Sequence, residues 1–217
     1  WAKPDSVPPT PKIRRYLASY PTRVPADLTP RIPTQDDIYD HILGTNNSAA
    51  GPDGIPFAIY RLCADTVAPL LHGIVVSLSK GFPPPAGFNH ARLFLIPKND
   101  SLDIEATRPI SVTNSDNRII AKTLTTAITP ACQSFLDPSQ KGFVAGRQSE
   151  EHILALNQAY YTALTRKQQH YILFLDTKKA FDSIHHEFIL AVLDVLAMPR
   201  WFCFVVAGLL QSVQVSP

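Results

Sequence analysis

The sequence predicts a mixed α/β fold. Three observations support this prediction: several stretches repeat apolar residues at helical spacing, a few short runs have the composition of strands, and 45% hydrophobic content over 217 residues is enough for one sizeable core. The runs that predict strands are residues 92–98, 108–112 and 171–175. The stretches that predict helices are residues 34–43, 57–63, 66–80, 114–136, 150–167 and 186–197, while residues 201–210 fit either a helix or a strand.

Composition limits the classes of function. A formal net charge of +2 is only mildly basic and does not by itself indicate a nucleic-acid-binding protein. The three cysteines, Cys63, Cys132 and Cys203, have neither metal-ligand nor disulfide spacing, which favours a reducing compartment. No apolar run approaches the roughly 18 residues needed to span a bilayer, so no membrane partner is expected.

The N-terminal region divides near residue 33. Residues 1–33 contain eight prolines together with Arg and Lys, which predicts an extended linker that packs loosely on the rest. Thr34 then starts a helix with Asp36 and Asp37 in its first turn, where the helix dipole favours acids, and we interpret this pair as capping rather than metal-binding. Gly44 is expected to end this helix as a left-handed cap.

Two of the predicted strands form a plausible hairpin. Residues 92–98 read RLFLIPK and residues 108–112 read RPISV, with a polar loop between them. Lys98 and Arg108 would lie near its tip, where two cations could hold a triphosphate. Surface strands often carry such cations without any ligand, and spacing alone leaves both interpretations open.

Further basic residues follow along the chain. Arg118 and Lys122 are four residues apart on one predicted helix, so they share a face that is either solvated or in contact with nucleic-acid phosphates. Arg147 follows a glycine in the string QKGFVAGR and is the candidate there for a phosphate or carboxylate contact.

Residues 170–187 read HYILFLDTKKAFDSIHHE. The apolar run 171–175 predicts a strand buried on both faces, and the carboxylate of Asp176 at its end needs a partner such as a divalent cation. Taken singly, these residues have simpler explanations. Asp176 would cap a turn or pair with Lys178 or Lys179, Phe181 would belong to the core, and Asp182 or Ser183 would cap the next helix.

Five strings in register resemble the reverse transcriptases of non-LTR retrotransposons. They are AGPDGIP at 50–56, IPK with RPIS at 96–111, DNRIIAK at 116–122, QKGFVAGR at 140–147 and DTKKAFDS at 176–183. The resemblance covers about residues 34–217. It implies the fingers, residues 34–148, and part of the palm, residues 149–217, of a right-hand polymerase, with helices packed on a small incomplete sheet.

The resemblance also implies site residues. Asp176 would be a catalytic ligand of two Mg²⁺ ions, which must be held by hard carboxylates. Phe181 would gate the sugar, Thr177 would also bind the substrate, and Lys98 and Arg108 would bind the triphosphate. Arg118, Lys122 and Arg147 would contact nucleic acid. The partners implied are an RNA template, a DNA primer and deoxynucleoside triphosphates, in the cytoplasm or nucleus.

The sequence departs from the family pattern after Asp182. Neither the Gln-Gly motif nor the aromatic-x-Asp-Asp hairpin, which supplies the remaining carboxylates, is found there. We therefore expect this chain to be the N-terminal piece of a longer reading frame and to be inactive in primer extension. Two alternatives stay open: a nucleic-acid-binding remnant without chemistry, and a decayed element whose product has no function.

Overall fold

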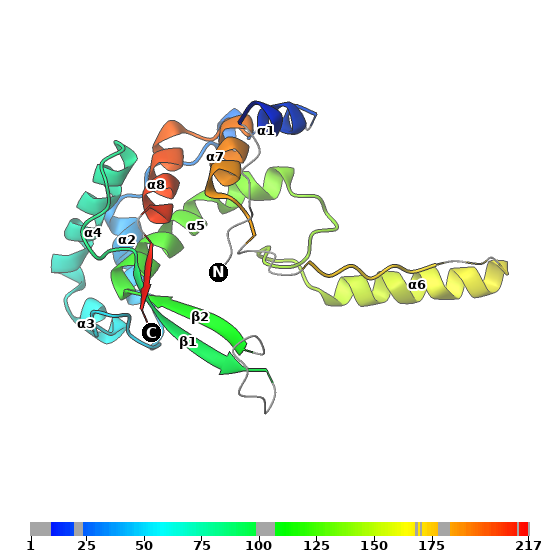
Figure 1. The fold of residues 1–217 in the computed structure, drawn as a ribbon, viewed down its shortest axis with the longest axis horizontal. Helices are drawn as coiled ribbons and strands as arrows, with labels where there is room; N and C mark the ends of the chain where they lie inside the picture. Colours follow the sequence, from blue (N-terminus) through cyan, green and yellow to red (C-terminus); the bar gives the residue numbers. More distant parts are fainter. Residues whose placement is uncertain are drawn as a thin grey trace.

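The computed structural model describes residues 10–19, 24–98, 107–167, 169, 171–177, 183–211 and 213–216. In this part of the chain, α-helices and a small sheet form the predicted mixed α/β fold (Figure 1). The helices are α1 Thr10–Leu17, α2 Gln35–Leu43, α3 Phe57–Leu62, α4 Ala64–Ser79, α5 Ser115–Phe135, α6 Glu150–Arg166, α7 His186–Val195 and α8 Arg200–Leu210, with a 3₁₀ helix at Ala26–Leu28. The strands are β1 His90–Pro97, β2 Thr107–Thr113 and β3 Gln214–Ser216.

The sheet has the order β2-β1-β3. Strands β1 and β2 pair antiparallel, so the predicted hairpin is confirmed, and it projects from the helical body (Figure 1). Strand β3 pairs parallel with the start of β1. With only three residues, β3 is too short to give a periodic signal in the sequence.

One hydrophobic core lies among α2, α4, α5 and α8. Its largest fully buried side chains are Ile38, Ile42, Val75, Leu78, Ile119, Ile120 and Val205. Helix α4, predicted at residues 66–80, buries Leu71, Val75 and Leu78, whereas Leu70 on the same helix is 64% exposed. Among the described residues, no helix combines the length and apolar character needed to cross a membrane.

The N-terminal stretch is not wholly extended, so that prediction is wrong for residues 10–17. They form α1, which packs against α7 through Leu17 and Ala191, and Arg14 lies 3.1 Å from the carboxylate of Asp194. The number of prolines misleads here because Pro11 lies in the first helical turn. Backbone N–H groups in that turn have no partner within the helix, so a proline there removes no helical hydrogen bond. Both charged side chains are more than half exposed, so the apolar contact contributes more than the ion pair.

The start of α2 is a capping box, as the sequence predicts. The Thr34 hydroxyl accepts a hydrogen bond from the Asp37 N–H at 3.2 Å, and the Asp37 carboxylate accepts one from the Thr34 N–H at 2.7 Å. Arg31 donates two further bonds to this carboxylate and, together with Thr34, lowers the pKa of Asp37 to about 2. The predicted left-handed cap at Gly44 is wrong, since its φ is −77°.

This cap makes stability depend on pH. The folded pKa of Asp37 lies below its ordinary value of 3.8, so its stabilising contribution is present above about pH 4 and is lost as the pH falls towards 2. We expect Asp37→Asn to reduce the change in the free energy of unfolding, measured with urea, between pH 4 and pH 2. At pH 7 this variant should be less stable by roughly 1 kcal/mol. Asp36→Asn, in the same turn but outside the capping box, serves as the control. If it reduces the pH dependence of the free energy of unfolding equally, the pH dependence does not come from the capping box.

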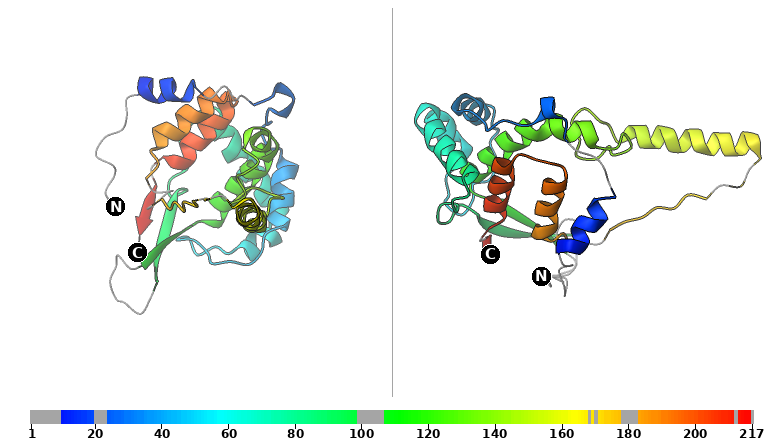
Figure 2. Two further views of the ribbon diagram at one scale, coloured as in Figure 1. Left: turned by 90° about the vertical axis from the view of Figure 1, so that its right-hand side faces the viewer. Right: turned by 90° about the horizontal axis from the view of Figure 1, so that it is seen from above.

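The predicted strand at 171–175 is wrong. Residues 171–177 have no regular secondary structure, and Tyr171 and Leu175 are 93% and 85% exposed. A strand needs a neighbour for its backbone N–H and C=O groups, and none of the described strands pairs with this segment. It returns from the far end of α6 towards the body, and we call α6 and residues 171–177 the arm (Figure 2).

The predicted cap of the next helix is also wrong. Helix α7 has His185 as its N-cap, later than the predicted Asp182 or Ser183. Asp182 itself lies outside the described residues.

Candidate nucleotide and nucleic-acid site

Lys98 and Arg108 lie at the same end of the hairpin formed by β1 and β2. Arg108 in β2 pairs with Ile96 in β1, and Lys98 directly follows the last residue of β1. Lys98 lies in the bend that directly follows the last pair of the ladder, Pro97 with Thr107, so both cations lie at the loop end of the hairpin. Both cations are exposed to solvent.

Two buried asparagines fix the base of the hairpin. The Asn117 side-chain amide, at the start of α5, donates to the Phe88 carbonyl at 3.2 Å and to the Asn89 side-chain oxygen at 3.0 Å. Asn89 in turn donates to the carbonyls of Gly208 and Gln211 at 2.8 and 2.6 Å. The residue before β1 is therefore tied to α5 on one side and to the end of α8 on the other. Both asparagines are more than 90% buried.

The loop at 50–56 packs on the start of α5. The Asp53 N–H donates to the Asn114 side-chain oxygen at 3.2 Å, and the Ser115 hydroxyl donates to the Ile55 carbonyl at 2.7 Å. A Cβ on Gly51 would lie 2.5 and 2.6 Å from the Cα and N of Asn114, which is closer than real Cβ contacts. Two strings that resemble the same family are thus adjacent in space, although more than 50 residues separate them.

The same junction holds two carboxylates. Asp53 and Asp116 line a pocket of about 410 Å³ together with His90 and Asn114. Burial and then the nearby Asp53 raise the pKa of Asp116. Burial, followed by these two acids, raises the pKa of Tyr60 to about 12. Burial at this junction therefore disfavours the charged form of each group.

Arg118 serves the protein's own structure. Its terminal nitrogens donate to the Ser48 hydroxyl at 2.9 Å and to the Ala49 carbonyl at 2.6 Å, and its guanidinium lies 4.5 Å above the Phe57 ring. Burial lowers the pKa of Arg118. These contacts tie α5 to the loop that follows α2, and its contact with nucleic acid stays a prediction.

Lys122 lies one turn further along α5 and is exposed. It lines a pocket of about 520 Å³ with Arg118, His41 and Asn46. Lys122 therefore presents its charge to solvent beside a hollow surface, as a contact to a phosphate backbone requires.

Arg147 closes the end of α5. Its guanidinium donates to the carbonyls of Leu136, Asp137 and Gln140 at 3.2, 2.5 and 2.8 Å. A cation at a helix C-terminus satisfies carbonyls that have no partner within the helix. The predicted phosphate contact of Arg147 is untested, and the described geometry gives this side chain a structural role.

Asp176 and Thr177 are exposed on the arm, on irregular chain rather than at the end of a strand. Phe181, the predicted sugar gate, lies outside the described residues. No described contact joins Asp176 to Lys98 or Arg108. The structure therefore places the two cations at one end of a hairpin whose base is held by Asn89 and Asn117. It does not place Asp176 beside these cations.

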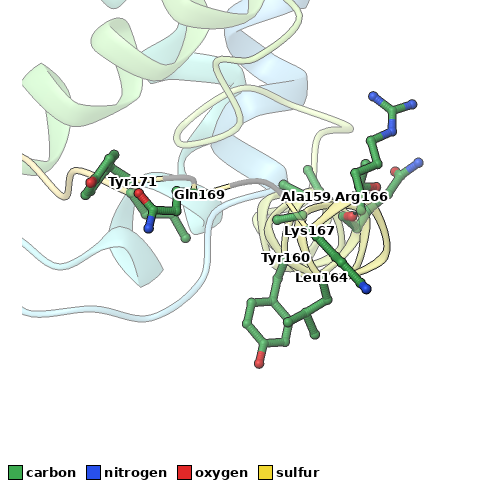
Figure 3. Close-up of a pocket in the computed structure, with 12 residues that line it drawn as sticks. Ala159, Tyr160, Leu164, Arg166, Lys167, Gln169 and Tyr171 are labelled. Atoms are coloured by element: carbon green, nitrogen blue, oxygen red, sulfur yellow. Dashed lines mark hydrogen bonds between the residues drawn. The ribbon is translucent and has the colours of Figure 1, made fainter.

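Sequence analysis missed Asn89 and Asn117. Asn89 is followed by His90 and Asn117 lies between Asp116 and Arg118, so each has a polar neighbour and no strand or helix periodicity marks it as buried. A pocket on the arm was also missed. It measures about 1080 Å³ and lies between α6 and the residues Gln169, Tyr171 and Ile172 (Figure 3).

Comparison with known proteins supports the resemblance. Residues 96–216, more than half of the chain, match the family model described as reverse transcriptase (RNA-dependent DNA polymerase). The matched region begins in β1 and includes β2, α5, the arm and the C-terminal helices.

Two relatives are named after transposable elements. The chain is 26% identical over 158 residues to the transposon TX1 uncharacterized 149 kDa protein of Xenopus laevis, and 27% identical over 168 residues to the retrovirus-related Pol polyprotein from type-1 retrotransposable element R2 of Nasonia vitripennis. These alignments cover 72% and 77% of the chain but only 12% and 16% of the relatives. On the match over residues 96–216, the chain belongs to the reverse transcriptase family.

Proposed function

We propose that this chain provides the nucleotide-binding fingers and part of the palm of a retrotransposon RNA-directed DNA polymerase. The arrangement of the hairpin carries the proposal. Lys98 and Arg108 lie at one end of a hairpin whose base is fixed by Asn89 and Asn117. Two cations held in this way can neutralise the triphosphate of an incoming deoxynucleotide.

Helix α5 provides the proposed contact with nucleic acid. Lys122 is the exposed cation of α5 that we assign to the phosphate backbone of an RNA template or a DNA primer. Arg118 and Arg147 contribute indirectly, because Arg118 holds the loop after α2 in place and Arg147 holds the loop after α5 in place. Phe181 stays the proposed sugar gate, and residues 34–148 and 149–217 stay the proposed fingers and palm.

Members of this family use divalent metal ions. Asp176 has the hard oxygen donors that Mg²⁺ prefers. However, the described residues contain no group of three or more His, Cys, Asp or Glu placed to hold an ion, and one carboxylate does not hold two ions. The described donors therefore do not fit a two-metal centre, and we derive no catalytic step through one.

Nucleotide binding tests the proposal. We expect the chain to bind deoxyadenosine triphosphate, measured by isothermal titration calorimetry in EDTA-containing buffer at low salt. Lys98→Ala and Arg108→Ala should each weaken binding about tenfold, the effect of removing one charge-assisted hydrogen bond. Binding should also weaken as salt is added, because the contacts are ionic.

Arg92→Ala provides the matched control. Arg92 is an exposed cation on the same strand, six residues from Lys98 and hence about 20 Å away along the chain. We expect it to leave triphosphate affinity within twofold of wild type. Equal losses in all three variants would mean that the hairpin attracts anions only through its overall charge, and the assigned site would be wrong.

A further inference from the structure

A pocket of about 520 Å³ lies between the end of α2, the loop after it and helix α5. Its volume falls within the range of about 300–1,000 Å³ that is usual for small-molecule sites. All of its lining residues belong to the proposed fingers, so the pocket does not depend on the palm. The buried side chains of Phe57 and Ile119 form an apolar floor, and the exposed Asp40, Asn46 and Lys122 form a polar rim.

Two arginines hold the loop that carries Asn46. Arg61 in α3 donates to the Thr45 carbonyl at 2.8 Å, and Arg118 donates to the Ala49 carbonyl at 2.6 Å. The loop is therefore tied to α3 before Asn46 and to α5 after it. A loop that is fixed in this way loses little conformational freedom when a ligand binds, so its polar groups are already in place.

The lining indicates a neutral, flat group rather than a bare anion. The carboxylate of Asp40 repels a phosphate inside the pocket. Both ring nitrogens of His41 are already hydrogen-bonded, to the Asp37 carbonyl at 2.7 Å and to the Thr126 hydroxyl at 3.0 Å, so His41 contributes its ring and no free donor. An apolar floor with a carboxylate acceptor on its rim suits a nucleobase that has an exocyclic amino group.

We propose that this pocket takes one unpaired base of a single-stranded nucleic acid whose phosphate is held by Lys122. The Asp40 carboxylate accepts from the amino group of cytosine, adenine or guanine, and the Asn46 amide bonds to the same base edge. A paired base cannot enter, because its edge is already hydrogen-bonded, so the pocket selects single strands over duplexes. This inference rests on the proposed function, which assigns Lys122 to the phosphate backbone.

Fluorescence anisotropy of the full chain at low salt tests the proposal with labelled RNA of about 12 nucleotides. The probes are oligocytidine, oligouridine and a strand of the same length without bases. Cytosine and uracil have the same size but only cytosine has an exocyclic amino group, so oligocytidine should bind about fivefold more tightly than oligouridine. Removing the bases should weaken binding by about tenfold or more. Oligodeoxycytidine should bind as tightly as oligocytidine, since neither contact uses the 2′-hydroxyl.

Three variants separate the contacts to the base from the contact to the phosphate. Asn46→Ala should weaken oligocytidine binding about fivefold and leave the strand without bases unchanged. Asp40→Ala should remove the preference for oligocytidine over oligouridine. Lys122→Ala should weaken the binding of every strand, including a blunt RNA–DNA duplex that Asn46→Ala leaves unchanged. Asn157→Ala and Lys80→Ala are the matched controls, because both residues are exposed and neither lines the pocket.

Equal affinity for strands with and without bases would overturn the proposal, as would an Asn46→Ala loss of the same size on both or a requirement for RNA over DNA. A loss confined to Lys122→Ala would reject the base pocket and keep the phosphate contact. If no strand binds at low salt, the assignment of Lys122 fails as well. Binding of deoxyadenosine triphosphate at Lys98 and Arg108 is a separate measurement, so the nucleotide site and the base pocket can fail independently.

Discussion

Asn117→Asp is expected to lower the free energy of unfolding by about 3 kcal/mol at pH 7. The substitution keeps the shape of the side chain but replaces its N–H donors with an ionised carboxylate. The Phe88 carbonyl and the Asn89 side-chain oxygen, at 3.2 and 3.0 Å, would then face a third oxygen instead of a donor. Asn117 is only 9% exposed, so water does not replace the lost bonds, and the buried charge is unpaired.

Urea unfolding followed by circular dichroism measures this loss. Asn157→Asp is the control, because Asn157 is an exposed asparagine within α6 and should change stability by less than about 0.5 kcal/mol. Amide hydrogen exchange adds a local readout: protection at the start of β1 should fall more than protection within α4. If Asn117→Asp costs under 1 kcal/mol, the asparagine pair does not fix the hairpin.

The elements that sequence alone predicts correctly are those set by nearby residues. Thr34 and Asp37 are three residues apart and cap α2 by reciprocal hydrogen bonds, so both partners of the interaction lie in one short stretch of sequence. The hairpin and the helix α5 follow equally from short-range alternation and periodicity, and α5 buries Ile119, Ile120 and Leu124.

Predictions fail where distant segments decide the structure. The run 171–175 has the composition of a buried strand, but composition cannot supply the neighbouring strands that such burial requires. The helix at 10–17 depends on the contact of Leu17 with α7, about 175 residues away. For the same reason the site was predicted only in part: Lys98 and Arg108 come from a local hairpin, whereas the Asn89–Asn117 pair connects segments without any shared local pattern.

Gly51→Ala is expected to lower the free energy of unfolding by about 2 kcal/mol. The added Cβ would lie 2.5 and 2.6 Å from the Cα and N of Asn114, both backbone atoms at the start of α5 that cannot move aside like the end of a flexible side chain. The loop must shift, which weakens the bonds from the Asp53 N–H to Asn114 and from Ser115 to the Ile55 carbonyl. Overpacking of a well-packed contact typically costs about 1–3 kcal/mol.

Gly73→Ala makes the same chemical change with the opposite expected sign. Gly73 lies inside α4, and a Cβ there would meet nothing within 4 Å. Alanine has the higher helix propensity, so this variant should be more stable by about 0.5–1 kcal/mol. Because both variants replace glycine by alanine, the difference between them isolates the contact with Asn114. Equal stability changes in urea unfolding would show that the loop at 50–56 does not rest on α5, and the link between these two strings would then have to be abandoned.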